Sequence, residues 1–235
     1  MSGEEEKRRW KGPNPKAGRS ERSLTERVDV KKARTASSRA WLERQLNDPY
    51  VKRAKSEGAR ARALYKLQEL DQQFGLIKRG ARVIDLGAAP GGWTQYCVKQ
   101  GAGAVVGIDL LPVEPLPGAT FFEHDFLADD APDMLMRALG GKPDIVLSDM
   151  AANTTGHAKT DQIRTGALAE AAADFAMAHL GEGGAFVTKA FQGGLDAALL
   201  ARLKQSFASV RHAKPPASRA ESPEIYVVAT GFRAG

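Results

Sequence analysis

The spacing of hydrophobic and polar residues changes near residue 80. Between residues 38 and 75, apolar side chains recur every three or four positions, which is typical of amphipathic helices. This spacing predicts two helices that are joined near residues 47–49, the second ending around Gly75. After Gly80, short apolar runs indicate strands, and they read ARVIDL, AVVGIDL, ATFFEHD, DIVLSDM, GAFVTKAF and EIYVVATGF. Helical spacing returns between most of these runs, at residues 131–139, 161–180 and 195–207.

The alternation of strands with helices predicts an α/β fold, with a mainly parallel sheet and helices on both of its faces. Ligands of such sheets bind beyond the carboxyl ends of the strands. The polar residues at these ends are therefore the first candidates for function, and they are Asp85, Asp109, Asp125, Asp149 and Lys189.

A glycine-rich loop follows the first predicted strand, in the segment VIDLGAAPGGWTQ at residues 83–95. Such a loop brings backbone N–H groups close to a ligand. A nucleoside triphosphate does not fit, because Trp93 stands where the P-loop requires a lysine, and the dinucleotide pattern Gly-x-Gly-x-x-Gly is not matched either. Asp109 ends the second strand, 22 residues after Gly87, where an acid can accept hydrogen bonds from ribose hydroxyls. The combination favours an adenosine without a pyrophosphate, such as S-adenosylmethionine, over a turn that serves packing alone.

Positive charge is concentrated in the N-terminal quarter of the chain. Residues 1–60 hold 17 Lys and Arg against 9 Asp and Glu, whereas the whole chain of 235 residues has a net charge of +6. Residues 1–37 lack a sustained apolar pattern and are predicted to be a basic, mostly disordered arm. The domain would then span residues 38–235, with N-terminal helices at 38–75 and an α/β core at 81–232. Basic N-terminal segments often bind nucleic acid, although a solubilising tail is the alternative.

Composition excludes several classes of protein. Cys97 is the only cysteine, so neither an intrachain disulfide nor a thiolate metal cluster can form. No apolar stretch approaches the ~20 residues that cross a bilayer, and the charged N-terminus does not resemble a secretory signal. The histidines show no metal-ligand spacing, and they are His124, His157, His179 and His212. We therefore expect a cytoplasmic protein without a metal, monomeric by default.

Six segments occur in the order found in FtsJ-like ribosomal RNA 2′-O-ribose methyltransferases: VIDLGAAPGGWTQ, GIDLLP, HDF, DIVLSDMAANTTG, FVTKAFQG and SRAESPEIYVVATG. The chain resembles this family over roughly residues 38–231. The resemblance implies a Rossmann-like fold with a seven-stranded sheet, S-adenosylmethionine as the methyl donor, and a uridine of large-subunit ribosomal RNA as the acceptor. It also implies a catalytic tetrad of Lys66, Asp149, Lys189 and Glu224. The donor contacts that it implies come from Gly91, Trp93, Asp109, Asp125 and Asp149.

The sequence departs from the family pattern at three places. Ala151-Ala152-Asn153 follows Asp149 where the family usually has Ala-Pro-Asn, which affects the rigidity of the loop but removes no chemical group. Glu221 stands where close relatives often carry a basic residue, and this change weakens one expected phosphate contact. The polar arm before Ser38 is longer than in compact bacterial members. None of these departures removes a member of the tetrad.

The tetrad suits proton transfer from a ribose 2′-hydroxyl. This hydroxyl is a poor nucleophile, so the protein must align its oxygen with the activated methyl group and remove its proton. We assign the proton transfer to Lys189, with the other three residues acting in one unit with it. Taken singly, each of the four residues could be an ordinary surface charge. Two other functions also fit the pattern, namely methylation of a transfer RNA or a messenger RNA cap, and RNA binding without catalysis.

The basic residues nearest to Lys66 are the candidates for RNA binding. Lys52, Arg53, Lys55 and Arg60 lie in a segment that is predicted to be helical and that leads directly to Lys66. Phosphates bound there would lie near the chemistry. We therefore expect these four side chains to anchor ribosomal RNA by salt-dependent contacts.

Overall fold

The computed structural model describes residues 42–43, 45–152, 156–192 and 195–234. The chain divides into two units, Met1–Asn47 and Asp48–Gly235, and the fold reported below is that of the second unit. The predicted arm at residues 1–37 and its boundary at Ser38 lie outside the described residues, so both stay predictions.

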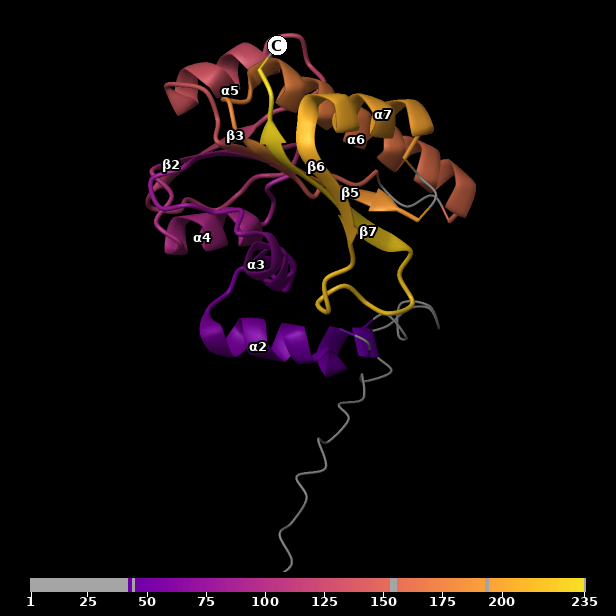
Figure 1. Ribbon diagram of the computed structural model, residues 1–235. Helices are drawn as coiled ribbons and strands as arrows, with labels where there is room; N and C mark the ends of the chain where they lie inside the picture. The colour runs from indigo at the N-terminus through magenta and orange to yellow at the C-terminus, as the bar shows by residue number, and fades with distance from the viewer. Residues whose placement is uncertain (1–41, 44, 153–155, 193–194, 235) are drawn as a thin grey trace, which may run out of the picture. The chain divides into compact units, whose positions relative to one another are not determined.

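A seven-stranded sheet forms the centre of the second unit, within the residues that the structure describes (Figure 1). The strand order is β3-β2-β1-β4-β5-β7-β6. The first five strands of this order run parallel, and β7 is antiparallel to both of its neighbours. The predicted α/β, Rossmann-like class is thereby confirmed. The strands are β1 (Arg82–Leu86), β2 (Ala104–Asp109), β3 (Ala119–Glu123), β4 (Ile145–Ser148), β5 (Ala185–Phe191), β6 (Phe207–Ala213) and β7 (Glu224–Phe232).

Helices cover both faces of the sheet (Figure 1). On one face lie α3 (Ala63–Phe74) and α4 (Gly92–Lys99), with α2 (Pro49–Glu57) packed against α3. On the other face lie α5 (Ala131–Leu139), α6 (Ala158–His179) and α7 (Ala197–Ser206). None of the described helices is long and apolar enough to cross a membrane.

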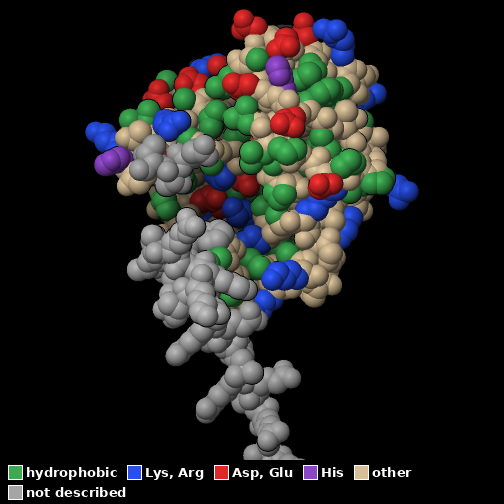
Figure 2. Space-filling view, turned by 180° about the vertical axis from the view of Figure 1, so that it is seen from behind, with side chains coloured by type: hydrophobic (Ala, Val, Ile, Leu, Met, Phe, Trp, Pro, Cys, Tyr) green, Lys and Arg blue, Asp and Glu red, His purple; other side chains and the backbone are tan. Residues whose placement is uncertain are grey.

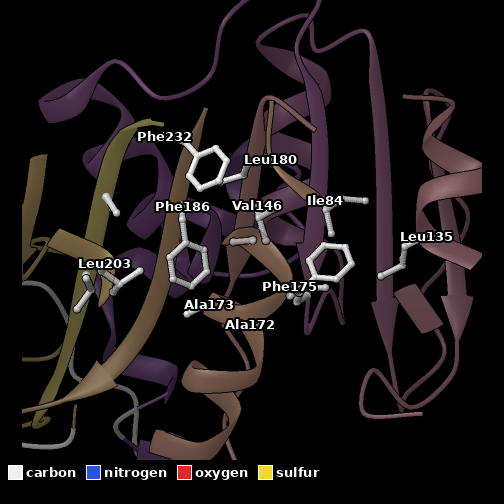
Figure 3. Packing of buried hydrophobic residues seen from close by; sticks show 14 of the residues in the cluster. Ile84, Leu135, Val146, Ala172, Ala173, Phe175, Leu180, Phe186, Leu203 and Phe232 are labelled. Atoms are coloured by element: carbon white, nitrogen blue, oxygen red, sulfur yellow. The ribbon is translucent and has the colours of Figure 1, made fainter. Parts of the chain in front are cut away.

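The strands are apolar on both sides because each face of the sheet carries its own core. Neighbouring residues of a strand point to opposite faces. Val83 accordingly packs with the helices α3 and α4, whereas Ile84 packs with α5, α6 and α7. Figure 3 shows the second core, in which Ile84, Val146 and Phe186 of the sheet lie beside Phe175 and other helix side chains.

The predicted helix ending at Gly75 is broken in the structure, and the prediction of one continuous helix there is wrong. Helix α2 ends at Glu57, and Gly58 follows in the left-handed region with φ 67°. Its N–H donates to the carbonyl of Ala54, which closes the helix with a glycine cap. A new helix, α3, starts at Ala63. The break turns the chain so that α3 can lie against the sheet while α2 packs on α3.

Strand β6 was not among the six apolar runs in the sequence. Its segment, FASVRHA, carries Arg211 and His212 and shows only a partial alternation of buried and exposed residues. It is an edge strand that pairs on one side with β7, so few of its side chains need to be apolar. The other strands and the helices α5, α6 and α7 start within about three residues of the predicted positions.

Candidate active site

The four residues of the expected tetrad lie together at the carboxyl edge of the sheet, although they come from four elements. Lys66 is on α3, Asp149 follows β4, Lys189 is on β5, and Glu224 begins β7. The Nζ of Lys66 is 2.7 Å from one carboxylate oxygen of Glu224 and 2.9 Å from the other. The Nζ of Lys189 is 3.0 Å from Oδ1 of Asp149 and donates to its backbone carbonyl at 2.7 Å.

The two ion pairs join into one cluster. The Nζ of Lys189 is 4.0 Å from Oε2 of Glu224, so this carboxylate lies between both ammonium groups. The four side chains are only 10–17% exposed, which strengthens their electrostatic interactions relative to a solvated surface. Figure 2 shows acidic and basic side chains meeting in a hollow of the face seen from behind. Their catalytic roles stay a prediction, but their proximity is what proton transfer requires.

The antiparallel register of β5 and β7 explains how Lys189 and Glu224 meet. Lys189 lies opposite Tyr226, and Phe191 lies opposite Glu224. Glu224 and Tyr226 are two residues apart on one strand, so their side chains point to the same face. This is the face on which α3 lies, and α3 places Lys66 with its Nζ 5.8 Å from the centre of the Tyr226 ring. The cluster therefore depends on long-range packing.

Tyr226 is a member of this cluster that was not predicted from the sequence. Its side chain is fully buried, and its hydroxyl donates to Oδ1 of Asp149 at 2.8 Å. Burial and the nearby charges of Asp149 and Glu224 raise the pKa of Tyr226 far above its usual value, so the phenol keeps its proton. The alternation of polar Glu224 and Tyr226 at the start of a mostly apolar strand is the signal in the sequence that could have revealed it.

Asp149 is ionised at neutral pH. Burial alone would raise its pKa, but the charges of Lys189 and Lys66 and the hydrogen bonds from Tyr226 and Lys189 outweigh burial. The pKa of Asp149 is therefore below its usual value. A permanently charged carboxylate can orient an ammonium group without taking part in the proton exchange itself.

The glycine loop after β1 runs directly beside the loop after β4 that carries Asp149. Gly87 has a φ of 78°, and a Cβ placed there would lie 2.8 Å from the side chain of Met150, which follows Asp149. Only glycine fits this close approach without strain. Gly91 has a φ of 99° and is the N-cap of α4, and a Cβ there would lie 2.8 Å from the guanidinium of Arg60. The loop thus joins the expected donor site to the tetrad.

The side chain of Trp93 is buried in the core and does not face the expected donor site. Its side chain is 3% exposed, its Nε1 donates to the carbonyl of Ala63 at 2.8 Å, and its ring packs against Tyr226. The indole is therefore part of the core between α3 and α4. Trp93 lies in the first turn of α4, where backbone N–H groups have no partner within the helix and favour anions. A donor contact from Trp93 would come from its backbone.

Asp109 at the end of β2 and Asp125 after β3 accept hydrogen bonds from backbone N–H groups of the loops at this edge. Asp109 accepts the N–H of Ala89 on one oxygen and the N–H of Leu111 on the other, both at 2.9 Å. Asp125 accepts the N–H of Leu127 at 2.9 Å. Since a carboxylate can accept about four hydrogen bonds, both acids retain room for ligand hydroxyls. The exposed apolar side chains next to them suit a flat aromatic base, and they are Leu110, Leu111 and Leu127.

Asp85 differs from the other strand-end acids because it is completely buried. Its Oδ2 accepts the hydroxyl of Thr94 at 2.6 Å, while Oδ1 has no hydrogen-bond partner among the described residues. Burial, with smaller contributions from Asp149 and Asp109, raises the pKa of Asp85 to about 7. The side chain braces α4 beneath the glycine loop, which makes it a support of the loop rather than a ligand of the donor.

The basic segment before Lys66 is only partly available for RNA. Arg60 donates to the backbone carbonyls of Glu114 and Pro115 in the loop after β2. Arg53 is bonded to Glu57 at 2.7 Å and lies over the ring of Tyr65. Lys52 and Lys55 are exposed on α2. Arg60 therefore holds a loop of the protein, and Arg53 makes contacts on the exposed surface of α2, where Lys52 and Lys55 also face solvent.

No three His, Cys, Asp or Glu side chains are grouped as metal ligands in the described part of the chain. The residues of the site instead suit a nucleoside donor. The first turn of α4 follows the glycine loop, and two acids with unused acceptors stand at the end of β2 and after β3.

A seven-stranded sheet of this order, with a glycine loop after β1 and acids after β2 and β3, defines a Rossmann-like methyltransferase. The chain belongs to the FtsJ-like methyltransferase family, whose model matches residues 59–232.

Similar proteins agree with this placement. The chain is 60% identical to the "Ribosomal RNA large subunit methyltransferase E" of Novosphingobium aromaticivorans, over 92% of this chain and 97% of the relative. It is 56% identical to the protein of the same name from Hyphomonas neptunium, over 98% and 99% of the two chains. Among solved structures, a ribosomal RNA methyltransferase from Plasmodium falciparum is similar with a TM-score of 0.64 and 29% identity, over 74% of this chain and 98% of that one.

Proposed function

We propose that this methyltransferase transfers a methyl group from S-adenosylmethionine to the ribose 2′-hydroxyl of a uridine in large-subunit ribosomal RNA. The observation that carries the proposal is the cluster of Lys66, Asp149, Lys189 and Glu224 beside the glycine loop. High identity to ribosomal RNA large subunit methyltransferases over almost the whole chain supports the choice of RNA.

The donor is held by the half of the edge formed by β1, β2 and β3. When bound, S-adenosylmethionine supplies a methyl group that is already activated by the sulfonium. Asp109 accepts hydrogen bonds from the ribose hydroxyls of the adenosine, and Asp125 follows the neighbouring strand β3, two residues after its end. The N–H groups of Gly92 and Trp93 in the first turn of α4 favour the negative end of the methionine arm, and Gly91, which precedes the helix, lets the chain turn into it.

The acceptor hydroxyl is activated by the tetrad. Lys189 Nζ removes the proton of the 2′-hydroxyl, for which the amine must be neutral at that moment. Asp149 fixes Lys189 through two contacts, to its Oδ1 and to its backbone oxygen. Glu224 and Lys66 hold the other side of the cluster at 2.7 Å from each other. The four residues therefore act as one unit.

Methyl transfer to three RNAs tests the proposal. Purified protein is given radiolabelled S-adenosylmethionine with large ribosomal subunits, with naked ribosomal RNA and with transfer RNA, all lacking the modification. We expect label in large-subunit ribosomal RNA, recovered after nuclease digestion as a 2′-O-methylated uridine. Label confined to transfer RNA, or attached to a base, would contradict the proposal.

A further inference from the structure

The loop between β6 and β7, residues 214–223, reaches the catalytic cluster through a side chain that the reaction itself does not use. The loop is braced internally by Lys214, which donates to the carbonyls of Ala220 and Ser222. Its tip contains Ala217, which is fully buried, and Ser218, which is 6% exposed. The backbone N–H and carbonyl groups of these buried residues need hydrogen-bond partners within the protein.

Helix α3 and the residue before it supply these partners at Ala217. The N–H of Ala217 donates to Oε2 of Glu69 at 2.7 Å, and its carbonyl accepts from the guanidinium of Arg62. Both of these side chains are themselves fixed. Glu69 accepts the hydroxyl of Tyr50 at 2.9 Å, and Arg62 pairs with the buried Asp48 at 2.8 Å. Ala217 is therefore held through both its N–H and its carbonyl by the segment that carries Lys66.

Ser218, the residue after Ala217, connects this fixed loop to the tetrad. Its hydroxyl donates to Oε1 of Glu224 at 2.8 Å. The same carboxylate receives Lys66 at 2.7 Å and lies 4.0 Å from Lys189. A carboxylate between two ammonium groups can turn toward either of them, and a neutral donor in a fixed place selects one orientation.

We propose that Ser218 is a positioning residue of the methyl-transfer site, whose hydroxyl orients the Glu224 carboxylate and through it Lys66. The proposal rests on the proposed catalytic role of the tetrad. Ser218 touches no reacting atom in this scheme. Its loss should slow the chemical step and leave donor binding unchanged, because the donor residues are on the other half of the edge.

Three variants test this role. Ser218→Ala removes the hydroxyl, Ser218→Thr keeps it, and Ser206→Ala at the end of α7, on the opposite face of the sheet, is the matched control. The single-turnover rate is measured with saturating donor and large subunits, the donor Kd by calorimetry, and folding by thermal melting. We expect Ser218→Ala to lower the rate about 10- to 150-fold, the range for a hydrogen bond to a charged group. Ser218→Thr should restore most of the rate, and neither variant should change the donor Kd.

A double-mutant cycle separates positioning from general structural damage. If Ser218 acts through Glu224, adding Ser218→Ala to Glu224→Gln should cause no further loss of rate. A full additional loss, or a wild-type rate for Ser218→Ala, would overturn the proposal for Ser218. Equal losses for the alanine and threonine variants together with lower melting temperatures would overturn it too. The proposed catalytic role of Glu224 fails by a different result, a wild-type rate for Glu224→Gln itself, and the proposed function fails if label is confined to transfer RNA or attached to a base.

Discussion

The two halves of the carboxyl edge of the sheet are built by different interactions. In the donor half, after β1, β2 and β3, the carboxylates of Asp109 and Asp125 are bonded to backbone N–H groups of nearby loops. In the acceptor half, after β4 and on β5 and β7, the charged groups are bonded to one another. Asp125 bonds a residue two positions away, whereas Lys66 and Glu224 are 158 positions apart.

We infer from this difference that the two halves have different tasks, one in binding the donor and the other in the chemical step. In the donor half the carboxylates hold backbone N–H groups in place, and we expect this half to determine how tightly the donor binds. A charged cluster from four elements is suited to hold groups in the orientation that the transition state needs. Substitutions in the donor half should therefore change affinity, and substitutions in the acceptor half should change the rate.

The largest expected effect is on the rate, in the acceptor half. Lys189→Ala should lower the single-turnover methylation rate by roughly 10²–10⁴-fold, the usual range for loss of a general acid or base. The donor Kd, measured by calorimetry, should be nearly unchanged. Lys204→Ala, which removes an exposed lysine of α7, is the matched control and should behave as wild type. A Lys189→Ala enzyme with near wild-type turnover would refute the role of this amine.

The next effect is on stability, and it concerns the buried side chain of Asp85 beneath the glycine loop. Burial raises the pKa of Asp85 from 3.8 to about 7, so between these pH values the folded protein keeps a proton that the unfolded chain has lost. The free energy of unfolding therefore falls as the pH rises through this window. The amide that Asp85→Asn introduces has no such proton to lose. Relative to wild type, this variant should gain about 3 kcal/mol of stability between pH 5 and pH 8.

Urea unfolding at several pH values measures this difference. Asp129→Asn, which changes an exposed acid before α5, is the control and should follow the wild-type pH dependence. If Asp85→Asn also ran parallel to wild type over the whole range, Asp85 would be ionised in the fold, and the support would be a charged one.

A smaller effect is expected for donor affinity. Asp109→Ala removes a charged acceptor and should raise the donor Kd by about 10- to 150-fold, as for loss of a hydrogen bond to an ionised group. Asp129→Ala is the control for removal of a nearby acid. Calorimetric titration with S-adenosylmethionine gives the two constants directly. Equal affinities for wild type and Asp109→Ala would show that the ribose is not bound at the end of β2.

The smallest effect lies outside both halves, on α2. Lys52 and Lys55 are exposed, so replacing both with Ala should weaken RNA binding and reduce the slope of log affinity against log salt by roughly 1 for each lost phosphate contact. Arg60→Ala should behave differently, because Arg60 holds the loop that contains Glu114 and Pro115. It should alter donor affinity and leave the salt slope unchanged. The reverse pattern would mean that Arg60 is a phosphate contact.

Local features of the site could be predicted from the sequence, because short-range patterns determine them. The glycine loop, the acid at the end of β2 and the order of the six apolar strands follow from spacing within a few residues. The resemblance to a family then identified Lys66 and Glu224, which no local pattern connects.

What could not be predicted depends on tertiary contacts. The buried indole of Trp93 is explained only by α3 packing across it, and the bond from Ser218 to Glu224 only by α3 holding Ala217. The helix break at Gly58 was missed because the apolar spacing continues on both sides of it. Edge strand β6 was not predicted because it lacks a clear apolar pattern. Pairing with β7 on one side stabilises it, although many of its side chains are polar or exposed.

The division between the two halves is tested most directly by the single-turnover rate as a function of donor concentration, measured for Asp109→Ala and Lys189→Ala side by side. We expect Asp109→Ala to approach the wild-type rate once the donor exceeds its raised Kd. Lys189→Ala should reach saturation at the wild-type donor concentration and stay slow at every higher one. A Lys189→Ala enzyme that excess donor restores, or an Asp109→Ala enzyme that stays slow when saturated, would contradict the division.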